Sequence, residues 1–234
     1  MNQKIKALKT AIPYTFPILA SYIFLGFSYG LLMTQSGFST ITPIIISTFV
    51  YAGSMQFVSI ELLASAFNPI YTFILTIMVN ARHIFYGLSM LKPFENTGRK
   101  KLYLIYGLCD ETFLLNYAAA PPEDVDRGWF MFFITFLHHF YWVVGTALGA
   151  IAGNIIHFNT KGIDFTLTCL FVVMFLDQWE SAKEHLPIII GLGASVVSLI
   201  VFGSDSFLLP AMLIITIAFA VMWKKQESKV SEID

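Results

Sequence analysis

The chain has 234 residues, of which 56% are hydrophobic, 16% aromatic and only 12% charged, and its mean hydropathy is +0.71. Soluble globular domains carry about 25% charged residues, so this composition is typical of an integral membrane protein. The formal net charge is −1, with no concentrated patch of Lys and Arg outside short basic loops. This argues against nucleic acid as a partner, because phosphate binding depends on such patches.

Only two cysteines occur, Cys109 and Cys169, and both lie in apolar segments without a further Cys or His at metal-ligand spacing. We interpret them as small buried residues. The sequence also lacks a nucleophile beside a base and a glycine-rich phosphate loop. It therefore predicts no enzyme activity, no metal site and no cofactor.

Eight apolar segments are candidates for membrane helices, because about 20 apolar residues cross the hydrocarbon core. The first is too long for the apolar region of a signal peptide and lacks an A-x-A cleavage pattern, so we expect it to be retained. The sequence thus predicts one all-α membrane domain, residues 1–234, with about six to eight transmembrane segments. The candidates are Pro13–Met33, Thr42–Phe67, Pro69–Leu91, Leu102–Ala120, Gly128–Gly153, Phe165–Asp177, Leu186–Gly203 and Phe207–Trp223.

Two of these segments do not fit a simple crossing. The second is interrupted by Tyr-Ala-Gly-Ser-Met-Gln at residues 51–56, and the sixth is short and ends at Asp177. Backbone groups freed at such interruptions are tolerated only in the protein interior or beside water. We expect residues 42–67 and 163–180 to be broken or re-entrant, and the sequence leaves crossing and re-entry open for both.

The positions of Lys and Arg test the number of crossings, because these residues are retained in the cytoplasm. If the second and sixth segments enter and leave on one side, six crossings place all three basic clusters and both termini on the cytoplasmic side of the plasma membrane. The acidic loop Pro121–Asp126 then falls outside. The clusters are Lys4, Lys6 and Lys9; Lys92, Arg99, Lys100 and Lys101; and Lys224, Lys225 and Lys229.

The sequence also hints at an internal repeat. Gly26 and Gly30 in the first segment have counterparts in Gly145 and Gly149 of the fifth, at an offset of 119 residues. With three crossings in each half, the halves would be inverted, as in many transporters with interrupted helices and a midplane site. The alternatives are chance recurrence and simple close helix packing at these glycines. The halves would comprise residues 11–120 and 128–223.

A second charged feature lies in the stretch Met78–Tyr86, where Arg82 and His83 interrupt an otherwise uncharged run. An ionised guanidinium at membrane depth is costly unless it faces a partner or a wet cavity, so Arg82 is a candidate site residue. Its planar fork can bind a substrate carboxylate, and the alternative is a permanent ion pair with Asp110 or Glu111. His83 could relay protons or simply be satisfied by the backbone.

Further candidates for substrate binding surround this arginine. Gln56 follows the interrupted Gly53 and Ser54, so its amide and the freed carbonyls nearby could bind a substrate's ammonium or carboxylate. The alternative is that Gln56 only satisfies those backbone groups. Asn80 lies beside Arg82 in a segment whose apolar flanks are each too short to cross alone.

Proton carriers are expected among the acidic residues. Asp110 and Glu111 interrupt the fourth segment near its centre, and its flanks are too short to cross separately, so we expect the pair at membrane depth. Neighbours in a helix point about 100° apart, so one carboxylate can face Arg82 and the other a cavity. The alternative is placement at a helix end. Asp177 holds the corresponding position in the sixth segment and is a further candidate.

These motifs resemble the AzlC family. The resemblance rests on Tyr-Ala-Gly-Ser-Met-Gln-Phe at Tyr51–Phe57, on Asn80-Ala-Arg-His83 followed by Tyr86, and on Cys109-Asp-Glu-Thr-Phe113, with Asp164–Thr168 as a divergent match. The family comprises large subunits of two-component branched-chain amino acid transporters of the LIV-E or BrnF type. The resemblance implies transport of leucine, isoleucine, valine and sometimes methionine, often outward, with a small AzlD-like membrane subunit as partner.

The leading hypothesis is a proton-coupled secondary transporter subunit for apolar amino acids. Arg82 would hold the carboxylate, the open backbone before Gln56 would hold the other polar atoms, and Asp110 or Glu111 would carry the proton. The alternative is a channel-like or scaffold subunit whose partner performs translocation, and it predicts that loss of Arg82 affects assembly only. Apolar side chains need only an apolar pocket, so the sequence does not choose among substrates.

Overall fold

The computed structural model describes residues 3–66, 68–80, 82–155, 185–203 and 207–231, with a few single positions between 165 and 182. Every regular element in this part of the chain is a helix, as predicted. The chain divides into two compact units, residues 1–168 and 169–234, and each is described by itself. Most of the predicted sixth segment, including the candidate Asp177, lies outside the described residues.

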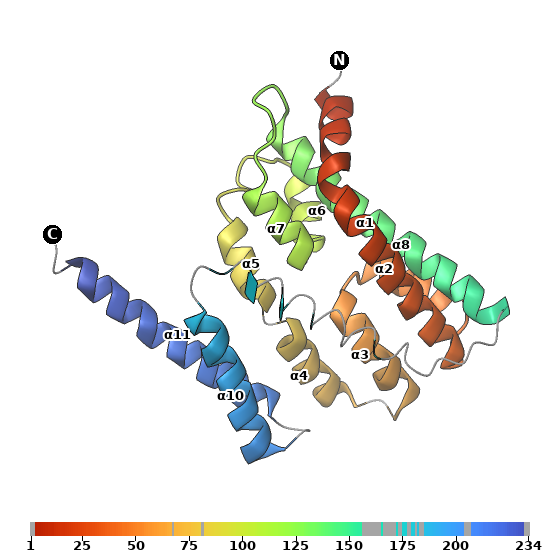
Figure 1. The fold of residues 1–234 in the computed structure, drawn as a ribbon. Coiled ribbons are helices and arrows are strands. Elements are labelled where there is room, and N and C mark those ends of the chain that lie inside the picture. Colours follow the sequence, from red (N-terminus) through yellow and green to blue (C-terminus); the bar gives the residue numbers. More distant parts are fainter. Residues whose placement is uncertain are drawn as a thin grey trace. The chain divides into compact units, whose positions relative to one another are not determined.

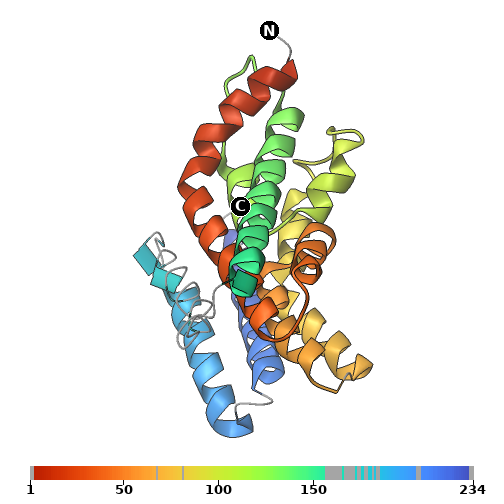
Figure 2. The same cartoon turned by 90° about the vertical axis from the view of Figure 1, so that its right-hand side faces the viewer.

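The two longest helices of the first unit are α1 (Gln3–Gln35) and α8 (Arg127–Ile155). They are the two single helices of the described residues that are long and apolar enough to cross a membrane. They lie side by side and run in the same direction (Figures 1 and 2). Lys4 lies 4.6 Å from the Trp129 ring near the start of both helices, so their N-terminal ends coincide.

Glycines allow α1 and α8 to pack at the backbone. A Cβ added at Gly26 would lie 2.7 Å from the carbonyl oxygen of Trp142, and one at Gly145 would lie 2.6 Å from that of Ile23. Distances this short are essentially never seen for real Cβ atoms. These positions therefore need glycine, which agrees with the packing role considered for this spacing.

The second predicted segment is broken, as expected. It forms α2 (Ile41–Phe49) and α3 (Gly53–Ala64), which are separated by residues 50–52. Ser47 on α2 contacts Thr146 near the middle of the α1–α8 pair, and α2 starts at the C-terminal end of α1. α3 then turns back toward that end, so the two short helices enter and leave on one side (Figure 1).

The third segment is also interrupted, which the sequence did not predict. It forms α4 (Pro69–Asn80) and α5 (Arg82–Met90), whose axes differ by 49°. Together they are long and apolar enough for one crossing. Met90 ends this broken helix in a core cluster with Ala7 of α1, so α4 and α5 run opposite to α1. The bend lies between Ile77 and Arg82.

A continuous fourth segment was a wrong prediction. The chain forms α6 (Lys100–Tyr106) and α7 (Asp110–Ala118), which are separated by residues 107–109. Thr112 explains the restart of the helix, because its hydroxyl accepts a 2.8 Å hydrogen bond from the backbone nitrogen of Cys109 and caps α7. Asp110 and the next carboxylate thus occupy the first helical turn, where the helix dipole favours negative charge.

The α6–α7 pair enters and leaves at the N-terminal end of α1. Lys100, which starts α6, lies 4.6 Å from the Trp129 ring, and the chain leaving α7 returns to the core cluster through Ala119 and Val125. A helix, or bent helix pair, that is long and apolar enough to cross a membrane and is followed by a short helical hairpin therefore occurs twice in residues 3–118. The second occurrence has the opposite direction to the first.

The predicted placement of the acidic loop on the outer side, opposite the N-terminal lysines, is wrong. Lys6 forms an ion pair with Asp124, and the backbone nitrogen of Asp126 donates to the Gln3 side chain at 3.3 Å. The hydrogen bond from Lys6 lowers the pKa of Asp124. The error arose because the fourth segment doubles back instead of crossing. For the same reason α1 and α8 are parallel, whereas halves related by the predicted inverted repeat would place them antiparallel.

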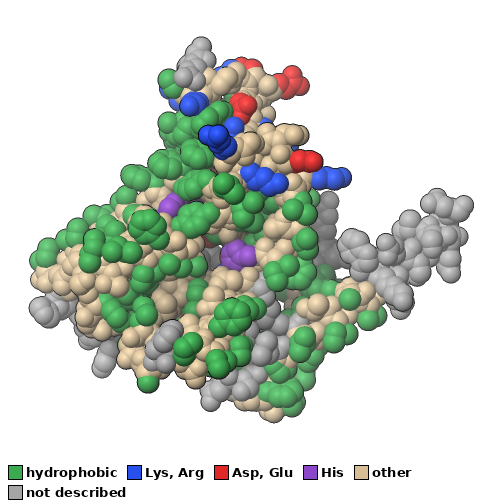
Figure 3. Space-filling model, turned by 180° about the vertical axis from the view of Figure 1, so that it is seen from behind, with side chains coloured by type: hydrophobic (Ala, Val, Ile, Leu, Met, Phe, Trp, Pro, Cys, Tyr) green, Lys and Arg blue, Asp and Glu red, His purple; other side chains and the backbone are tan. Residues whose placement is uncertain are grey.

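The charged end of the first unit is visible on its surface. Lys, Arg, Asp and Glu side chains gather at the end that holds the N-terminus, and below it many hydrophobic side chains lie on the surface among backbone and uncharged polar groups (Figure 3). This division is typical of a protein whose apolar flank faces lipid and whose charged end faces water.

In the second unit, α10 (Leu186–Phe202) packs against α11 (Leu208–Ser231).

Candidate functional site

The helix breaks of the first unit meet at one place. Tyr51, in the break between α2 and α3, has its hydroxyl 3.9 Å from Cys109 Sγ, in the break between α6 and α7. Arg82, which starts α5, donates from Nη2 to Ser54 Oγ in the first turn of α3 at 2.9 Å. The N-termini of α3 and α7 therefore converge beside Arg82, and their unpaired N–H groups and positive dipole ends favour an anionic group.

Arg82 is held by an ion pair at this junction. Its Nη1 lies 2.8 Å from Asp110 Oδ2, and the two side chains are 31% and 17% exposed. Tyr86 donates a 2.6 Å hydrogen bond to the other oxygen of the same carboxylate. Nε of Arg82 is buried with no hydrogen-bond partner in the described part of the chain. Nε is thus a buried donor nitrogen of the guanidinium that remains available to a ligand.

Glu111 has a different environment from its neighbour Asp110. Tyr22 of α1 donates a 2.7 Å hydrogen bond to Glu111 Oε2, and the same hydroxyl lies 3.2 Å from Cys109 Sγ. Among the described residues, the ion pairs are Lys6 with Asp124 and Arg82 with Asp110, so Glu111 has no cationic partner there. The two adjacent carboxylates therefore differ in their contacts: Asp110 pairs with a cation, and Glu111 accepts a hydrogen bond from a neutral side chain.

The predicted substrate-binding residues of α3 separate into two groups. Ser54 contacts Arg82, and Gly53 starts the helix at the same break. Gln56 is 1% exposed, and its amide is occupied: Nε2 donates to Ser47 Oγ at 2.8 Å, and Oε1 accepts from Trp142 Nε1 at 3.0 Å. Its partners are side chains, not the freed backbone groups considered from the sequence.

Asn80 and His83 make local contacts at the bend between α4 and α5. Asn80 Nδ2 donates to the carbonyl of Thr76 at 2.9 Å, and His83 Nδ1 lies 3.1 Å from the carbonyl of Asn80. These contacts match the alternative of a histidine satisfied by backbone. Both residues lie close to Arg82 in sequence, and these contacts occupy their polar groups at the bend.

Tyr51 carries a conformation that the sequence did not indicate. Its φ is +45°, in the left-handed region that side chains other than glycine rarely adopt. Its ring lies 4.5 Å from the His139 ring, and nearby Tyr106 donates to the carbonyl of Thr48 at 2.8 Å. Such strained residues concentrate at functional sites, where the surrounding structure holds them. The aromatic contacts fix the tip of the α2–α3 hairpin at the junction.

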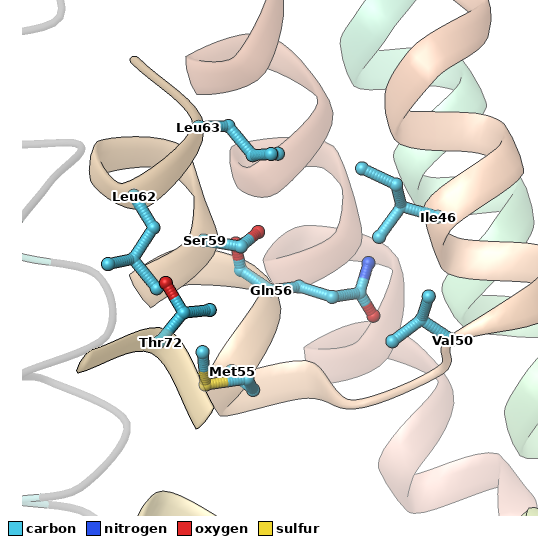
Figure 4. Close-up of a pocket in the computed structure, with 8 residues that line it drawn as sticks. All are labelled: Ile46, Val50, Met55, Gln56, Ser59, Leu62, Leu63 and Thr72. Carbon is cyan, nitrogen blue, oxygen red and sulfur yellow. The ribbon is translucent and has the colours of Figure 1, made fainter. Parts of the chain in front are cut away.

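An apolar pocket lies next to this junction, between α2, α3 and α4 (Figure 4). Its volume is about 200 Å³. Met55, which follows the Ser54 that contacts Arg82, forms part of its wall. The lining residues are Ile46, Val50, Met55, Gln56, Ser59, Leu62, Leu63 and Thr72.

The comparisons with known proteins are consistent with a membrane transport site. Residues 17–156 match the family described as AzlC protein, and this range includes all three helix breaks. The chain belongs to the AzlC family. The family is one of transport proteins, not enzymes. Its membership was predicted from the motifs around Tyr51, Arg82 and Asp110, and that prediction is confirmed.

Several relatives match this AzlC family chain over most of its length. It is 53% identical to branched-chain amino acid transport protein AzlC of Bacillus subtilis, over 94% of this chain and 87% of that protein. It is 39% identical to an uncharacterized membrane protein of Haemophilus influenzae, over 99% of this chain and 96% of that protein. It is 32% identical to inner membrane protein YgaZ of Escherichia coli, over 72% of this chain and 71% of that protein. No solved structure matches.

Proposed function

We propose that this chain is the large subunit of a secondary transporter that moves branched-chain and similar apolar amino acids across the plasma membrane. The observation that carries the proposal is Arg82 at the junction of three helix breaks, bound to Asp110 at 2.8 Å and to Ser54 at 2.9 Å. The Bacillus subtilis relative, which is 53% identical to this chain and is named a branched-chain amino acid transport protein, supports the choice of substrate.

A zwitterion matches the charges of this junction. The substrate carboxylate binds the guanidinium of Arg82, whose planar fork can donate two parallel hydrogen bonds. The substrate ammonium then takes the place of Arg82 beside Asp110. Each charge of the ion pair exchanges one partner for another, so the substrate enters without leaving a buried charge unpaired. The positive ends of the α3 and α7 dipoles further favour the carboxylate.

The proton coupling in this proposal rests on Glu111. The junction holds one guanidinium and two carboxylates among the described residues, and Arg82 neutralises Asp110. An ionised carboxylate without a cation is costly away from water, so Glu111 holds a proton when it is hydrogen-bonded to Tyr22. It releases the proton when the junction opens to water on one side. Of the four proton carriers expected from the sequence, Glu111 is therefore the one we propose.

Glu111→Gln is expected to uncouple transport from the proton gradient. Glutamine keeps the hydrogen bond to Tyr22 but carries no ionisable proton, so amino acid movement persists down its own gradient and loses its response to a collapsed proton gradient. The measurement is amino acid flux with and without a protonophore. Glu123→Gln, an exposed loop residue, serves as the matched control and should keep the wild-type response. A full protonophore response in Glu111→Gln contradicts this assignment.

The transporter is proposed to export its substrates and to act with a small AzlD-like membrane subunit. The N-terminus is assigned to the cytoplasm because Lys4, Lys6 and Lys100 gather at that end of the first unit, and Lys and Arg are retained on the cytoplasmic side. The acidic loop then also lies on the cytoplasmic side. The C-terminus is assigned there from its basic cluster.

The test is transport of an amino acid panel by cells that express this chain with and without the AzlD-like subunit. We expect efflux of leucine, isoleucine, valine and methionine when both subunits are present, and little when the small subunit is missing. Vector-only cells and the small subunit alone are the controls. Equal efflux from all four cell lines refutes the proposed function.

A further inference from the structure

The apolar pocket next to the junction has no role in the steps above. It lies between the side chains of Ile46 on α2 and Val50 just after α2 and those of Leu62 and Thr72 on the opposite side (Figure 4). Pockets for drug-sized ligands are roughly 300–1,000 Å³. At about 200 Å³ this pocket suits a smaller apolar group.

Two of the three polar residues that line the pocket, Gln56 and Ser59, have their side-chain polar atoms bound to other partners. The amide of Gln56 is bound by Ser47 and Trp142, and Ser59 Oγ donates to the carbonyl of Gln56 at 2.6 Å. Thr72 Oγ1 is buried and has no hydrogen-bond partner in the described residues. The walls are therefore formed by carbon and sulfur, with no free charge and no bound polar group directed into the pocket.

The pocket begins one residue from the proposed carboxylate site. Ser54 Oγ accepts from Arg82, and Met55, the next residue of α3, lines the pocket. Val50, in the break between α2 and α3, lines the pocket as well, so the pocket borders the break itself. The pocket then follows α3 to Leu62 and Leu63, away from the break. An amino acid whose carboxylate binds Arg82 can thus extend its side chain from the junction into this pocket.

We infer that this pocket binds the aliphatic side chain of the transported amino acid and limits its size. The inference rests on the proposed function and adds to it the residues that select the substrate. The polar ends of the substrate stay at Arg82 and Asp110, and the branched side chain contacts Ile46, Met55 and Leu62. Alanine fills the pocket poorly, and an aromatic side chain exceeds it.

The test changes the pocket volume at Ile46 in the complete transporter and measures competition among substrates. Cells that express the chain with its small subunit are loaded with equal amounts of leucine, alanine and phenylalanine. Ile46→Phe should lower the leucine-to-alanine efflux ratio about tenfold, because one methylene in an apolar pocket changes discrimination by roughly 10- to 200-fold. Ile46→Ala should raise the phenylalanine-to-leucine ratio.

Ile45→Phe is the matched control, because Ile45 is the neighbouring residue of α2, is 49% exposed and does not line the pocket. Thr72→Val is a second variant that keeps the shape and removes an unpaired hydroxyl, and it should retain leucine transport. Loss of leucine transport in Thr72→Val would mean that the pocket holds a polar group instead.

Ratios have the advantage that they do not depend on how much protein folds. Unchanged ratios in both Ile46 variants overturn the inference while leaving the proposed function intact. An equal fall for every amino acid overturns it too, since a packing defect has that effect. Loss of the small subunit from the purified complex, with unchanged ratios, would identify the pocket as a subunit contact. Absence of any efflux by the wild-type transporter refutes the proposed function itself.

Discussion

Arg82→Ala is expected to abolish amino acid transport while leaving the protein in the membrane. The substitution removes the proposed carboxylate ligand and leaves Asp110, which lies 2.8 Å from the guanidinium, without its cation. Truncation of one partner of a buried, hydrogen-bonded charge pair costs about 2–5 kcal/mol. A loss of about 3 kcal/mol corresponds to roughly a 100-fold fall in transport at limiting substrate.

Two further variants distinguish substrate binding from a structural ion pair. Arg82→Lys keeps the charge but loses the planar fork, so we expect partial transport with weaker apparent affinity. Arg127→Ala removes an exposed arginine at the start of α8 and should leave transport unchanged. Transport is measured as leucine efflux, and abundance by quantification of the membrane fraction.

The scaffold alternative makes the opposite prediction for Arg82→Ala. If the Arg82–Asp110 pair only holds α5 to α7, the variant loses abundance or its small subunit, and efflux per remaining complex stays at the wild-type level. The substrate-binding proposal requires normal abundance with lost efflux. A double variant, Arg82→Ala with Asp110→Asn, adds a clear comparison, because it removes both charges. Under the scaffold alternative, the double variant should regain the abundance that Arg82→Ala loses. Under the binding proposal, the double variant should still lack efflux.

The sequence predicted those parts of the site where a residue type does not suit its apolar segment. Arg82 stood out because an ionised guanidinium is costly in an apolar segment. The break before Gln56 was expected because Gly53 and Ser54 interrupt an apolar run. The pairing of Arg82 with Asp110 was one of two interpretations, because both acidic neighbours were available. Only the structure of the first turn of α7 shows that Asp110 pairs with Arg82 and that Glu111 contacts Tyr22.

The break before α7 illustrates what apolar length alone does not decide. Residues 102–120 are long enough to cross as one helix, so a continuous segment was the simplest interpretation. The competing signal was weak: Gly107 accepts close contact with the Thr135 side chain, and Thr112 caps the new helix. This one missed reversal also displaced the predicted side of the acidic loop and the direction of α8.

Long-range contacts account for the features of the site that the sequence did not predict. The partner of Glu111 is Tyr22, 89 residues earlier, and the partner of Gln56 is Trp142, 86 residues later. Neither tyrosine nor tryptophan differs in pattern from the many aromatic residues of an apolar helix. The sequence left Gln56 open between binding substrate and satisfying backbone groups, and in the folded chain its amide is bound by Ser47 and Trp142. Such contacts depend on the packing of α1 against α8.

Gly149→Ala is expected to destabilise that packing strongly. An added Cβ would overlap the carbonyl oxygen of Phe27 and lie 2.6 Å from its carbonyl carbon, and backbone atoms cannot rotate away as a side chain can. Overpacking costs about 1–3 kcal/mol and occasionally more, and 1 kcal/mol lowers Tm by roughly 2–4 °C in a protein of this size. We therefore expect Tm to fall by about 5–10 °C in detergent.

Gly87→Ala is the matched control for Gly149→Ala. It makes the same substitution inside α5, where an added Cβ meets nothing within 4 Å. Alanine is favoured over glycine inside a helix by about 1 kcal/mol, so its Tm should stay the same or rise slightly. Equal Tm values for the two variants would mean that α1 and α8 can separate at little cost. That result would contradict the role of their contact in holding Tyr22 against Glu111 and Trp142 against Gln56.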